Sequence, residues 1–307
     1  MIEKYHETAK QTGAILIPQA GVDSVPADII SYILAHHIRE KYNAGILSVT
    51  NTLYIVKGGF SGGTLLTATG IFNKYSLSKL KTAMHPYSLS PVRPKNPTPP
   101  PSSGFPYKLF GLLNVPEIGG LQTSGMMASV NAPIVHRSWG LFQSIAQQDP
   151  SKASLTYGPH FRYTEHMVAK SFLFGVLVNL SFATFGILMA FPPTRWLLNP
   201  LFKVVLPGAG QGPDKAAVEN APIGWRGVAV AETAKQEKVV AEFSTKRGGG
   251  YWTTALTLAE AAMVMLRGDL EATEAGKLGG GILTPAMLGD QYVERLRKAG
   301  VKLEVQE

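Results

Sequence analysis

The sequence ILSVTNTLYIVKGGFSGGT, residues 46–64, carries the strongest local signals for the fold. Residues 46–56 are rich in β-branched and aromatic side chains, which favours a β-strand. The glycine-rich turn at 58–63 leads from this strand into a predicted helix that runs from Thr64 to about Met84. A strand that passes directly into a helix indicates a fold with both kinds of element.

Strand and helix signals continue through the rest of the chain. Strand-like stretches occur at 154–163, 225–232 and 237–246. Helices are predicted at 131–148 and at 253–267. Together these patterns predict an α+β fold, in which a mixed sheet of these strands and 46–56 is covered on one side by helices.

The N-terminal region predicts a helix, a short apolar strand at 14–18, and a second helix that begins at Asp23-Ser24. A strand that is apolar throughout needs neighbours on both sides. The C-terminal segments around 282–284 and 301–305 are expected to supply them. A strand edge left unpaired favours a homodimer, aggregation or a partner that adds the missing strands.

Residues 86–106 contain eight of the 21 prolines in the chain. This composition predicts an irregular loop that is partly polyproline II. A long active-site or surface loop is the favoured interpretation, and a recognition motif for a proline-binding domain is the alternative.

The apolar segment 171–191 contains no charged residue, and none occurs between Lys170 and Arg195. As a helix, a segment of this length spans about 30 Å, which matches the hydrocarbon core of a bilayer. A buried core helix or helical hairpin, a membrane span, and insertion into one leaflet or a lipid-droplet monolayer all satisfy the pattern. We predict attachment to a membrane or lipid-droplet surface, with Arg195 and Trp196 at the interface.

Composition excludes several classes of site. The 307 residues include no cysteine, which excludes disulfides, thiolate nucleophiles and cysteine-ligated metals. The seven histidines lack metal-binding spacing, so no metal site is predicted, and the G-x-S-x-G motif of many hydrolases is absent. The formal net charge of +8 favours anionic partners, but the basic residues are scattered, which argues against nucleic acid.

Two glycine clusters invite comparison with phosphate-binding loops. The cluster at 208–213 ends in Pro213, which lacks an amide proton where a dinucleotide fingerprint needs helix donors. In the turn at 58–63, Ser61 and the amides of Gly62 and Gly63 precede Thr64 at a helix start, where they could hold an anionic or carbonyl oxygen. A plain cap and turn is the alternative for these residues.

Five motifs in order resemble those of the saccharopine dehydrogenase-like oxidoreductases, a family that includes trans-acting enoyl reductases of lipid biosynthesis and lipid-droplet-associated members. The motifs are Gly21-Val22-Asp23-Ser24-Val25-Pro26-Ala27-Asp28, Ser61-Gly62-Gly63-Thr64, Val135-His136-Arg137-Ser138, Gly210-Gln211-Gly212-Pro213 and Gly280-Gly281-Ile282-Leu283-Thr284-Pro285-Ala286. The resemblance extends from Tyr5 to Val305. Val22 stands where the family usually has Phe, and His136 where many members have Arg.

The resemblance implies a domain organisation. Family members begin with a Rossmann half that binds the dinucleotide, and this sequence starts at what resembles the last helix and strand of that half. Residues 1–44 are then the end of a Rossmann domain, 45–270 a substrate domain like the saccharopine reductase C-terminal domain, and 271–307 a segment that returns to the Rossmann part.

NADP(H) is the cofactor that the resemblance implies. Because its phosphate site has no counterpart here, no cofactor-binding residue is assigned, and the chain alone is expected to bind NADP(H) weakly or not at all.

The resemblance also implies roles for individual residues. Asp23 and Ser24 would face the nicotinamide and the substrate, and Ser61, Gly62, Gly63 and Thr64 would line the substrate side. Arg137 would anchor an anion or carbonyl, because its guanidinium can bind two oxygens at once. The alternatives are a helix N-cap for Asp23 or Ser24, and a surface or salt-bridged position for Arg137.

The resulting prediction is an NADP-dependent, enoyl-reductase-like oxidoreductase that acts on an apolar or lipid-like substrate, in a chain that has lost or lacks part of its redox apparatus. The alternative is a cofactor-free protein that binds or cyclises a hydrophobic molecule at a membrane, and a membrane-attached scaffold is the third option. The expected location is the surface of a lipid droplet or the endoplasmic reticulum, and otherwise the cytoplasm.

Overall fold

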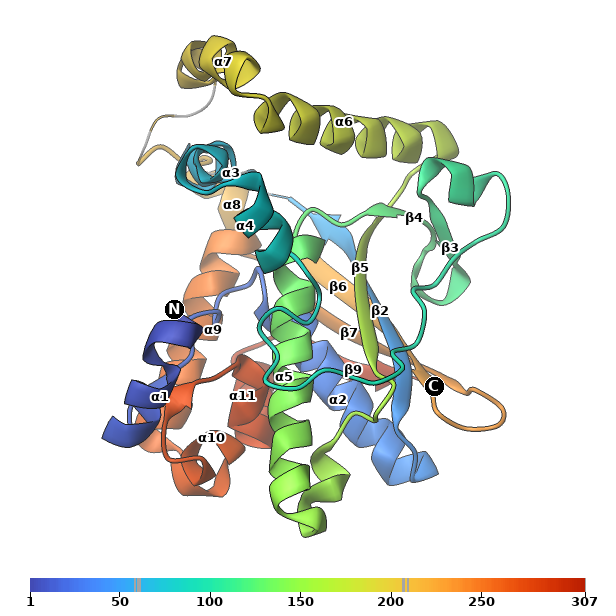
Figure 1. Cartoon of the computed structure of the whole chain (residues 1–307), viewed down its shortest axis with the longest axis vertical. Helices are drawn as coiled ribbons and strands as arrows, with labels where there is room; N and C mark the ends of the chain where they lie inside the picture. The colour runs from blue at the N-terminus through green and yellow to red at the C-terminus, as the bar shows by residue number, and fades with distance from the viewer. Residues whose placement is uncertain (58, 60–61, 206–207, 209, 307) are drawn as a thin grey trace.

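A computed structural model describes residues 1–57, 59, 62–205, 208 and 210–306. In this part of the chain, a seven-stranded sheet has the order β3-β4-β5-β2-β6-β7-β9 (Figure 1). Its strands are β2 (Ile46–Val56), β3 (Leu113–Val115), β4 (Gly120–Ser124), β5 (Arg162–Val168), β6 (Ile223–Ala231), β7 (Lys238–Thr245) and β9 (Lys302–Gln306). β2 and β5 run parallel, and the other neighbouring pairs run antiparallel. The prediction of a mixed sheet with helices is confirmed, and the sheet is mostly antiparallel.

One predicted strand is partly wrong. The segment 154–163 begins in a 3-10 helix, Pro150–Leu155, and the strand starts only at Arg162. Asp149 caps that helix by accepting a hydrogen bond from the Ser151 amide at 3.0 Å. Gly158 then has a φ of 116°, which an extended strand does not adopt.

A second, two-stranded sheet pairs β1 (Ile15–Leu16) in parallel with β8 (Gly281–Ile282). The expected pairing of the N-terminal strand with the segment around 282–284 is therefore confirmed. The expected pairing with 301–305 is wrong, because this segment forms β9 and adds to β7. In that register Leu303 lies opposite Phe243 and Val305 opposite Ala241, so both apolar side chains join the core face of the large sheet.

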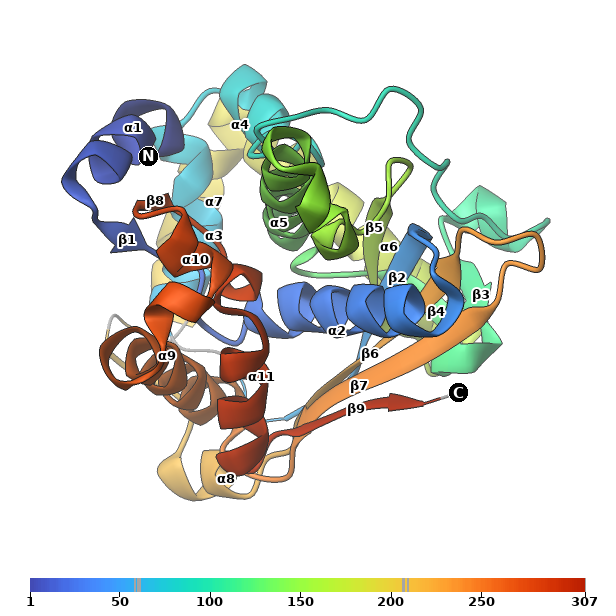
Figure 2. The ribbon, with the colours of Figure 1, turned by 90° about the horizontal axis from the view of Figure 1, so that it is seen from below.

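Helices cover one face of the large sheet, as Figure 2 shows from below. The α-helices are α1 (Ile2–Thr12), α2 (Val25–Tyr42), α3 (Gly62–Lys74), α4 (Leu77–Ala83), α5 (Ala128–Gln148), α6 (Phe172–Ala190), α7 (Pro192–Val205), α8 (Lys215–Glu219), α9 (Gly249–Arg267), α10 (Glu274–Lys277) and α11 (Gly289–Lys298). The 3-10 helices are η1 (Tyr107–Phe110), η2 (Pro116–Ile118), η3 (Pro150–Leu155), η4 (Leu270–Ala272) and η5 (Pro285–Leu288). The predicted helix 64–84 divides into α3 and α4, because Ser76 caps a new helix at the Lys79 amide.

Helix α2 lies directly on the sheet and forms the centre of the core. Ile29, Ile30 and Leu34 are fully buried in its contact with β6 and β7. A Cβ at Gly227 would lie 2.5 Å from Ile30 Cγ2, so only glycine allows the helix to approach β6 this closely. The opposite face of the sheet carries polar side chains. Glu242 forms ion pairs there with Arg226 and Lys302.

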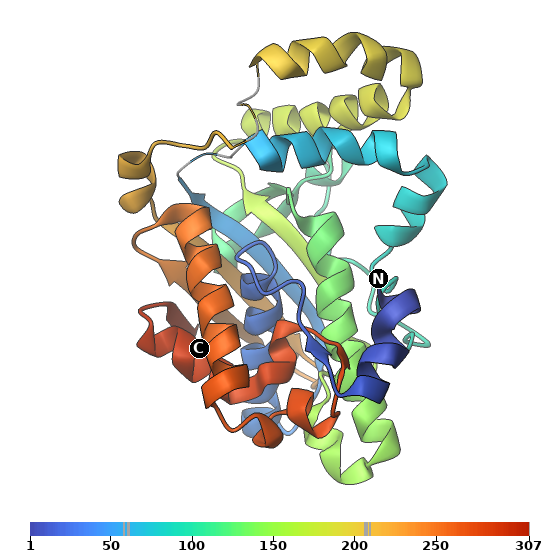
Figure 3. The same cartoon turned by 90° about the vertical axis from the view of Figure 1, so that its left-hand side faces the viewer.

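The apolar segment forms α6, which lies across one end of the molecule with α7 folded back beside it (Figure 3). Of the helices in the described residues, α6 alone is long and apolar enough to cross a membrane, with a mean hydropathy of 2.1. Only 11% of its most apolar stretch is buried inside the molecule, so the buried core helix considered from the sequence is wrong. The proline-rich residues 86–106 are irregular, as predicted.

Candidate functional site

A buried cluster of polar side chains forms where the loop before α2, the first turns of α5 and the strands β2 and β5 meet. Ser24 Oγ donates to Asn131 Oδ1 at 3.0 Å, and Asn131 Nδ2 donates to Glu165 Oε2 at 2.8 Å. Tyr163 OH donates to the same Oε2 at 2.7 Å and accepts a hydrogen bond from Asn51 Nδ2 at 3.1 Å. Five polar side chains from four elements thus form one network around the Glu165 carboxyl.

Strand geometry explains why these residues converge. Tyr163 and Glu165 are two positions apart on β5, so both face the helix layer. The parallel register places Asn51 of β2 directly opposite Glu165. Asn131, in the first turn of α5, then reaches back to the loop before α2, where its Nδ2 also donates to the Asp23 carbonyl at 2.6 Å.

Glu165 is the chemically distinctive member of this cluster. Burial raises the pKa of its carboxyl to about 7, and the negative charge of Asp23 acts in the same direction. Partial burial also raises the pKa of Asp23, whose side chain is nevertheless exposed. The protein therefore has a carboxyl group that exchanges protons near neutral pH beside an accessible aspartate.

The structure places Asp23 and Ser24 at the start of α2. Ser24 occupies the N-cap position but makes no side-chain cap hydrogen bond. Its hydroxyl donates to Asn131 instead. The predicted N-cap position of Ser24 is therefore confirmed, although its side chain does not cap the helix, and the catalytic roles of Asp23 and Ser24 stay predictions.

Three of the sequence motifs meet at a second buried network, around Asp28. Ser138 Oγ donates to Asp28 Oδ1 at 2.5 Å, and the Ala286 amide donates to Oδ2 at 2.8 Å. Ser138 also lies 2.7 Å from Thr284 Oγ1. Burial raises the pKa of Asp28 to about 7. This network joins α2, α5 and the segment after β8, so we assign it to the framework of the fold.

Arg137 belongs to the same framework. Its guanidinium is buried and donates to the carbonyl oxygens of Ile282 and Leu89, the latter at 2.6 Å. Burial lowers its pKa to about 10. The surface or salt-bridged position considered for Arg137 is wrong. In this structure its N–H groups bind backbone oxygens. Its role as an anchor for a substrate oxygen stays a prediction.

His136, where many members of the resembling family have Arg, is buried beside Arg137. Its Nε2 accepts from the Tyr163 amide at 3.1 Å, and its Nδ1 lies 2.7 Å from the Ala132 carbonyl. These two partners require the proton on Nδ1. Burial lowers the pKa of His136 to about 3, so the ring is neutral and fixes β5 against α5.

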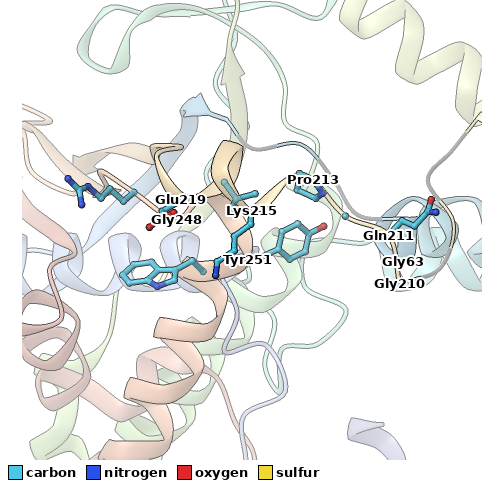
Figure 4. Close-up of a pocket in the computed structure, with 12 residues that line it drawn as sticks. Gly63, Gly210, Gln211, Pro213, Lys215, Glu219, Gly248 and Tyr251 are labelled. Carbon is cyan, nitrogen blue, oxygen red and sulfur yellow. The ribbon is translucent and has the colours of Figure 1, made fainter.

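A pocket of about 680 Å³ opens beside the N-terminus of α9 (Figure 4). It is lined by Gly63, Gly210, Gln211, Gly212, Pro213, Lys215, Val218, Glu219, Arg247, Gly248, Tyr251 and Trp252. The pocket thus unites the two glycine clusters that the sequence separates by more than a hundred residues. Most of its wall is apolar, with two cations and two large aromatic rings.

Of the predicted substrate-side residues, Gly63 lies at this pocket. Gly62 to Thr64 form the first turn of α3. Ser61 lies outside the described residues, so its predicted role stays a prediction with those of Gly62, Gly63 and Thr64.

The pocket and the polar cluster are neighbours through α9. The Val22 amide donates to Thr254 Oγ1 at 3.2 Å, two residues after Trp252 in the pocket wall. A Cβ at Gly21 would lie 3.3 Å from Thr254 Cγ2, so the loop that carries Asp23 packs closely on this helix. The loop that leads to Asp23 and Ser24 therefore packs on the helix that forms one wall of the pocket.

Sequence reasoning missed Glu165, Tyr163, Asn51 and the pocket aromatics. The signal for Glu165 was a carboxylate two positions after an aromatic residue in a strand, but the predicted strand ended at residue 163. Tyr251 and Trp252 directly follow the triplet Gly248-Gly249-Gly250, whose composition by itself indicates only a turn. In the described residues no group of three or more potential metal-ligating side chains occurs.

The described residues do not form a dinucleotide-binding unit. Within them, parallel pairing is confined to β1 with β8 and to β2 with β5. A Rossmann unit needs consecutive parallel strands joined by crossover helices, with a glycine turn at the first helix. A nicotinamide dinucleotide therefore does not fit these residues by themselves, and no residue is assigned to it.

Comparison with known proteins identifies relatives of nearly the whole chain. A Mycobacterium tuberculosis (strain H37Rv) protein provisionally named a trans-acting enoyl reductase is 33% identical over 315 aligned residues, which cover 99% of this chain and 70% of that protein. The trans-acting enoyl reductase of Mycobacterium ulcerans is 27% identical over 98% of this chain, and that of Mycobacterium bovis BCG is 26% identical over a similar span.

No family model and no solved structure matches this chain. The relatives are named for an oxidoreductase activity, which in general implies a nicotinamide cofactor. With a third of the residues identical across almost its entire length, the chain belongs to the trans-acting enoyl reductase family.

Proposed function

We propose that the protein reduces the carbon–carbon double bond of an apolar or lipid-like enoyl substrate, with NADP(H) as the hydride donor. The observation that carries this proposal is the 33% identity, over 99% of the chain, to a protein named for that activity. The apolar pocket beside Trp252 and the buried polar cluster beside Asp23 support it, because an acyl chain and a reacting enoyl group need adjacent apolar and polar sites.

The domain organisation belongs to the same proposal. Residues 1–44, 45–270 and 271–307 are the end of a Rossmann domain, a saccharopine reductase-like substrate domain and a returning segment. The parallel pair of β1 and β8, which joins the first and third of these segments, supports this division. Within the described residues β1 pairs with β8 alone and Leu16 is exposed, so the other edge of β1 can accept a further strand from another segment or from a second copy in a homodimer.

The activity is tested with a long-chain trans-2-enoyl thioester and millimolar NADPH, since the chain alone is expected to bind NADP(H) weakly, and the saturated thioester product is measured by mass spectrometry. Trp252→Ala should lower kcat/KM about tenfold, because loss of about 1.5 kcal/mol of apolar contact corresponds to that factor. Phe105→Ala is the matched control, since Phe105 is an exposed aromatic residue outside the pocket wall. An equal loss in both variants would contradict the assignment of the pocket.

A cofactor-free role is the second candidate: binding or cyclisation of a hydrophobic molecule at a membrane. The observation that favours it is that the described residues do not form a dinucleotide unit. We expect calorimetry of the chain alone to detect NADP(H) binding no tighter than millimolar, because no pyrophosphate turn or ribose-binding residue is assigned. Micromolar affinity for a monodisperse monomer would refute this expectation and remove the second candidate.

Attachment to a membrane or lipid-droplet surface is also part of the proposal. The exposed apolar side chains of α6 and the exposed Trp196 of α7 support an interfacial position rather than a span. Asn179, in the middle of α6, is bound to the protein: its Nδ2 donates to the Phe110 carbonyl at 2.8 Å and its Oδ1 accepts from the Ser124 amide at 3.0 Å. A helix held at its midpoint lies along the protein body.

A further inference from the structure

We propose that Glu165 is the acid that gives the α-carbon of the enoyl substrate its proton, an assignment that rests on the proposed reduction and deepens it. Reduction of an enoyl group adds a hydride to the β-carbon and a proton to the α-carbon. The relatives' names identify the overall reaction and leave the source of that proton open.

The proton itself comes from the chain and water, and NADP(H), the hydride donor of the proposed reduction, would supply the electron pair. Hydride addition at the β-carbon shifts an electron pair to the α-carbon and the carbonyl oxygen, which gives an enolate. A carbon–hydrogen bond then forms at the α-carbon as the O–H bond of Glu165 breaks, and Glu165 remains as a carboxylate. Water returns a proton to the carboxylate after the product leaves.

The hydrogen-bond network leaves one oxygen of Glu165 for this role. Asn51 Nδ2 donates to Tyr163 OH, which directs the tyrosine proton to Glu165 Oε2. Ser24 donates to Asn131 Oδ1, which turns the Asn131 amide nitrogen to the same Oε2. In the described part of the chain no hydrogen bond involves Oε1, so Oε1 is the oxygen that can carry and deliver a proton.

The surroundings of the carboxyl favour storage of a proton and its exchange with water. Glu165 is 6% exposed, so it is desolvated without being sealed. The charged and titratable groups that face it are Asp23 from the loop before α2 and Tyr163 on its own strand, with neutral His136 of α5 behind Tyr163. Burial and the Asp23 charge keep the proton on Glu165 up to about pH 7, and the exposed Asp23 provides a route to solvent.

The test uses the reverse of the proton step, which needs no cofactor. An acid that protonates the α-carbon becomes, as a carboxylate, a base that removes an α-proton from the saturated product. The full chain is incubated in D₂O with dodecanoyl-N-acetylcysteamine thioester, and deuterium uptake at the α-carbon is followed by mass spectrometry. The exchange rate should rise with pH to a plateau above about 7, because the carboxylate form of Glu165 acts.

Glu165→Gln, which keeps the shape and both accepted hydrogen bonds, should lower the exchange rate at least about 100-fold. Asp28→Asn is the matched control, since Asp28 is also a buried carboxyl with a pKa near 7 but belongs to the framework. Tyr163→Phe should retain exchange with a plateau reached at higher pH, because the carboxylate loses a hydrogen bond that stabilises it. A purely structural role for Glu165 would not move this pH profile.

Two outcomes overturn the assignment: no exchange above the buffer rate with the unmodified chain, or full exchange with folded Glu165→Gln protein. Thermal unfolding of each variant shows whether it is folded. Exchange that depends on Glu165 together with no oxidation of NADPH by the enoyl substrate would refute the proposed reduction and leave the proton-holding role of Glu165 intact.

Discussion

Replacing Asp28 with alanine should lower the free energy of unfolding by about 3 kcal/mol. The substitution removes the acceptor of two buried donors, the Ser138 hydroxyl and the Ala286 amide, and each donor left unpaired costs about 1–3 kcal/mol. Urea denaturation followed by tryptophan fluorescence measures the change. Asp28→Asn is the control, since its side chain retains an acceptor for Ala286 and a hydrogen-bonding partner for Ser138.

Comparison of Asp28→Asn with the unmodified chain tests the raised pKa of Asp28. Burial raises the pKa of Asp28 from 3.8 to about 7, so the folded state holds this proton more tightly than the unfolded state. The contribution of the protonated carboxyl is fully present below pH 4 and is lost as the pH rises to about 7. Asp28→Asn should therefore unfold at a higher temperature than the unmodified chain at pH 8, and at a similar temperature at pH 4. An equal difference in unfolding temperature between Asp28→Asn and the unmodified chain at pH 4 and pH 8 would contradict the raised pKa of Asp28.

The double variant Leu177→Glu/Leu180→Glu, which introduces charge on α6, should weaken binding to phospholipid vesicles at least about 100-fold. Both side chains are more than half exposed, at 53% and 57%. Burial of each leucine in the lipid is worth about 1.5–3 kcal/mol, which two glutamates remove. Flotation with vesicles of zwitterionic lipid measures the partition without the contribution of the positive net charge.

Leu258→Glu/Leu266→Glu on α9 is the matched control, because both leucines are exposed and lie on a helix distant from α6 (Figure 3). Point substitutions are preferable to deletion of the segment, since α6 also stabilises the fold: Thr123 Oγ1 lies 2.7 Å from Asn179 Oδ1 and 3.0 Å from the Gly175 carbonyl oxygen, and its proton bridges to these acceptors. Equal vesicle binding by both double variants would show that α6 does not attach the protein to membranes.

The candidate site was only partly predictable from the sequence. The motif around Asp23 and Ser24 was located because a glycine, a proline and polar residues at a helix start are a local pattern. Glu165 was not located, because its importance depends on burial under α2 and α5 and on the register that places it opposite Asn51. Burial is a property of the whole fold, and an isolated glutamate in a strand gives no sign of it.

Arg137 is a second residue whose contacts could not be predicted from the sequence. Its residue type and motif pointed to an anchor for a substrate oxygen, whereas the structure engages its guanidinium with the Ile282 and Leu89 carbonyls. These partners are 145 and 48 residues away in the chain. A guanidinium binds backbone and ligand oxygens equally well, so only the neighbours that folding brings to it decide which one it holds.

Local sequence determined the elements themselves: the strands at 46–56, 225–232 and 237–246 and the apolar helix after Lys170 follow from side-chain periodicity and composition, which act over a few residues. The tertiary structure decided their partners. Only the tertiary structure shows that residues 301–305 pair with β7 and that α6 lies on the surface. It also shows that the two glycine clusters lie at one pocket. These choices depend on which apolar faces remain to be covered once the whole chain has collapsed, and this competition among distant segments leaves no local pattern in the sequence.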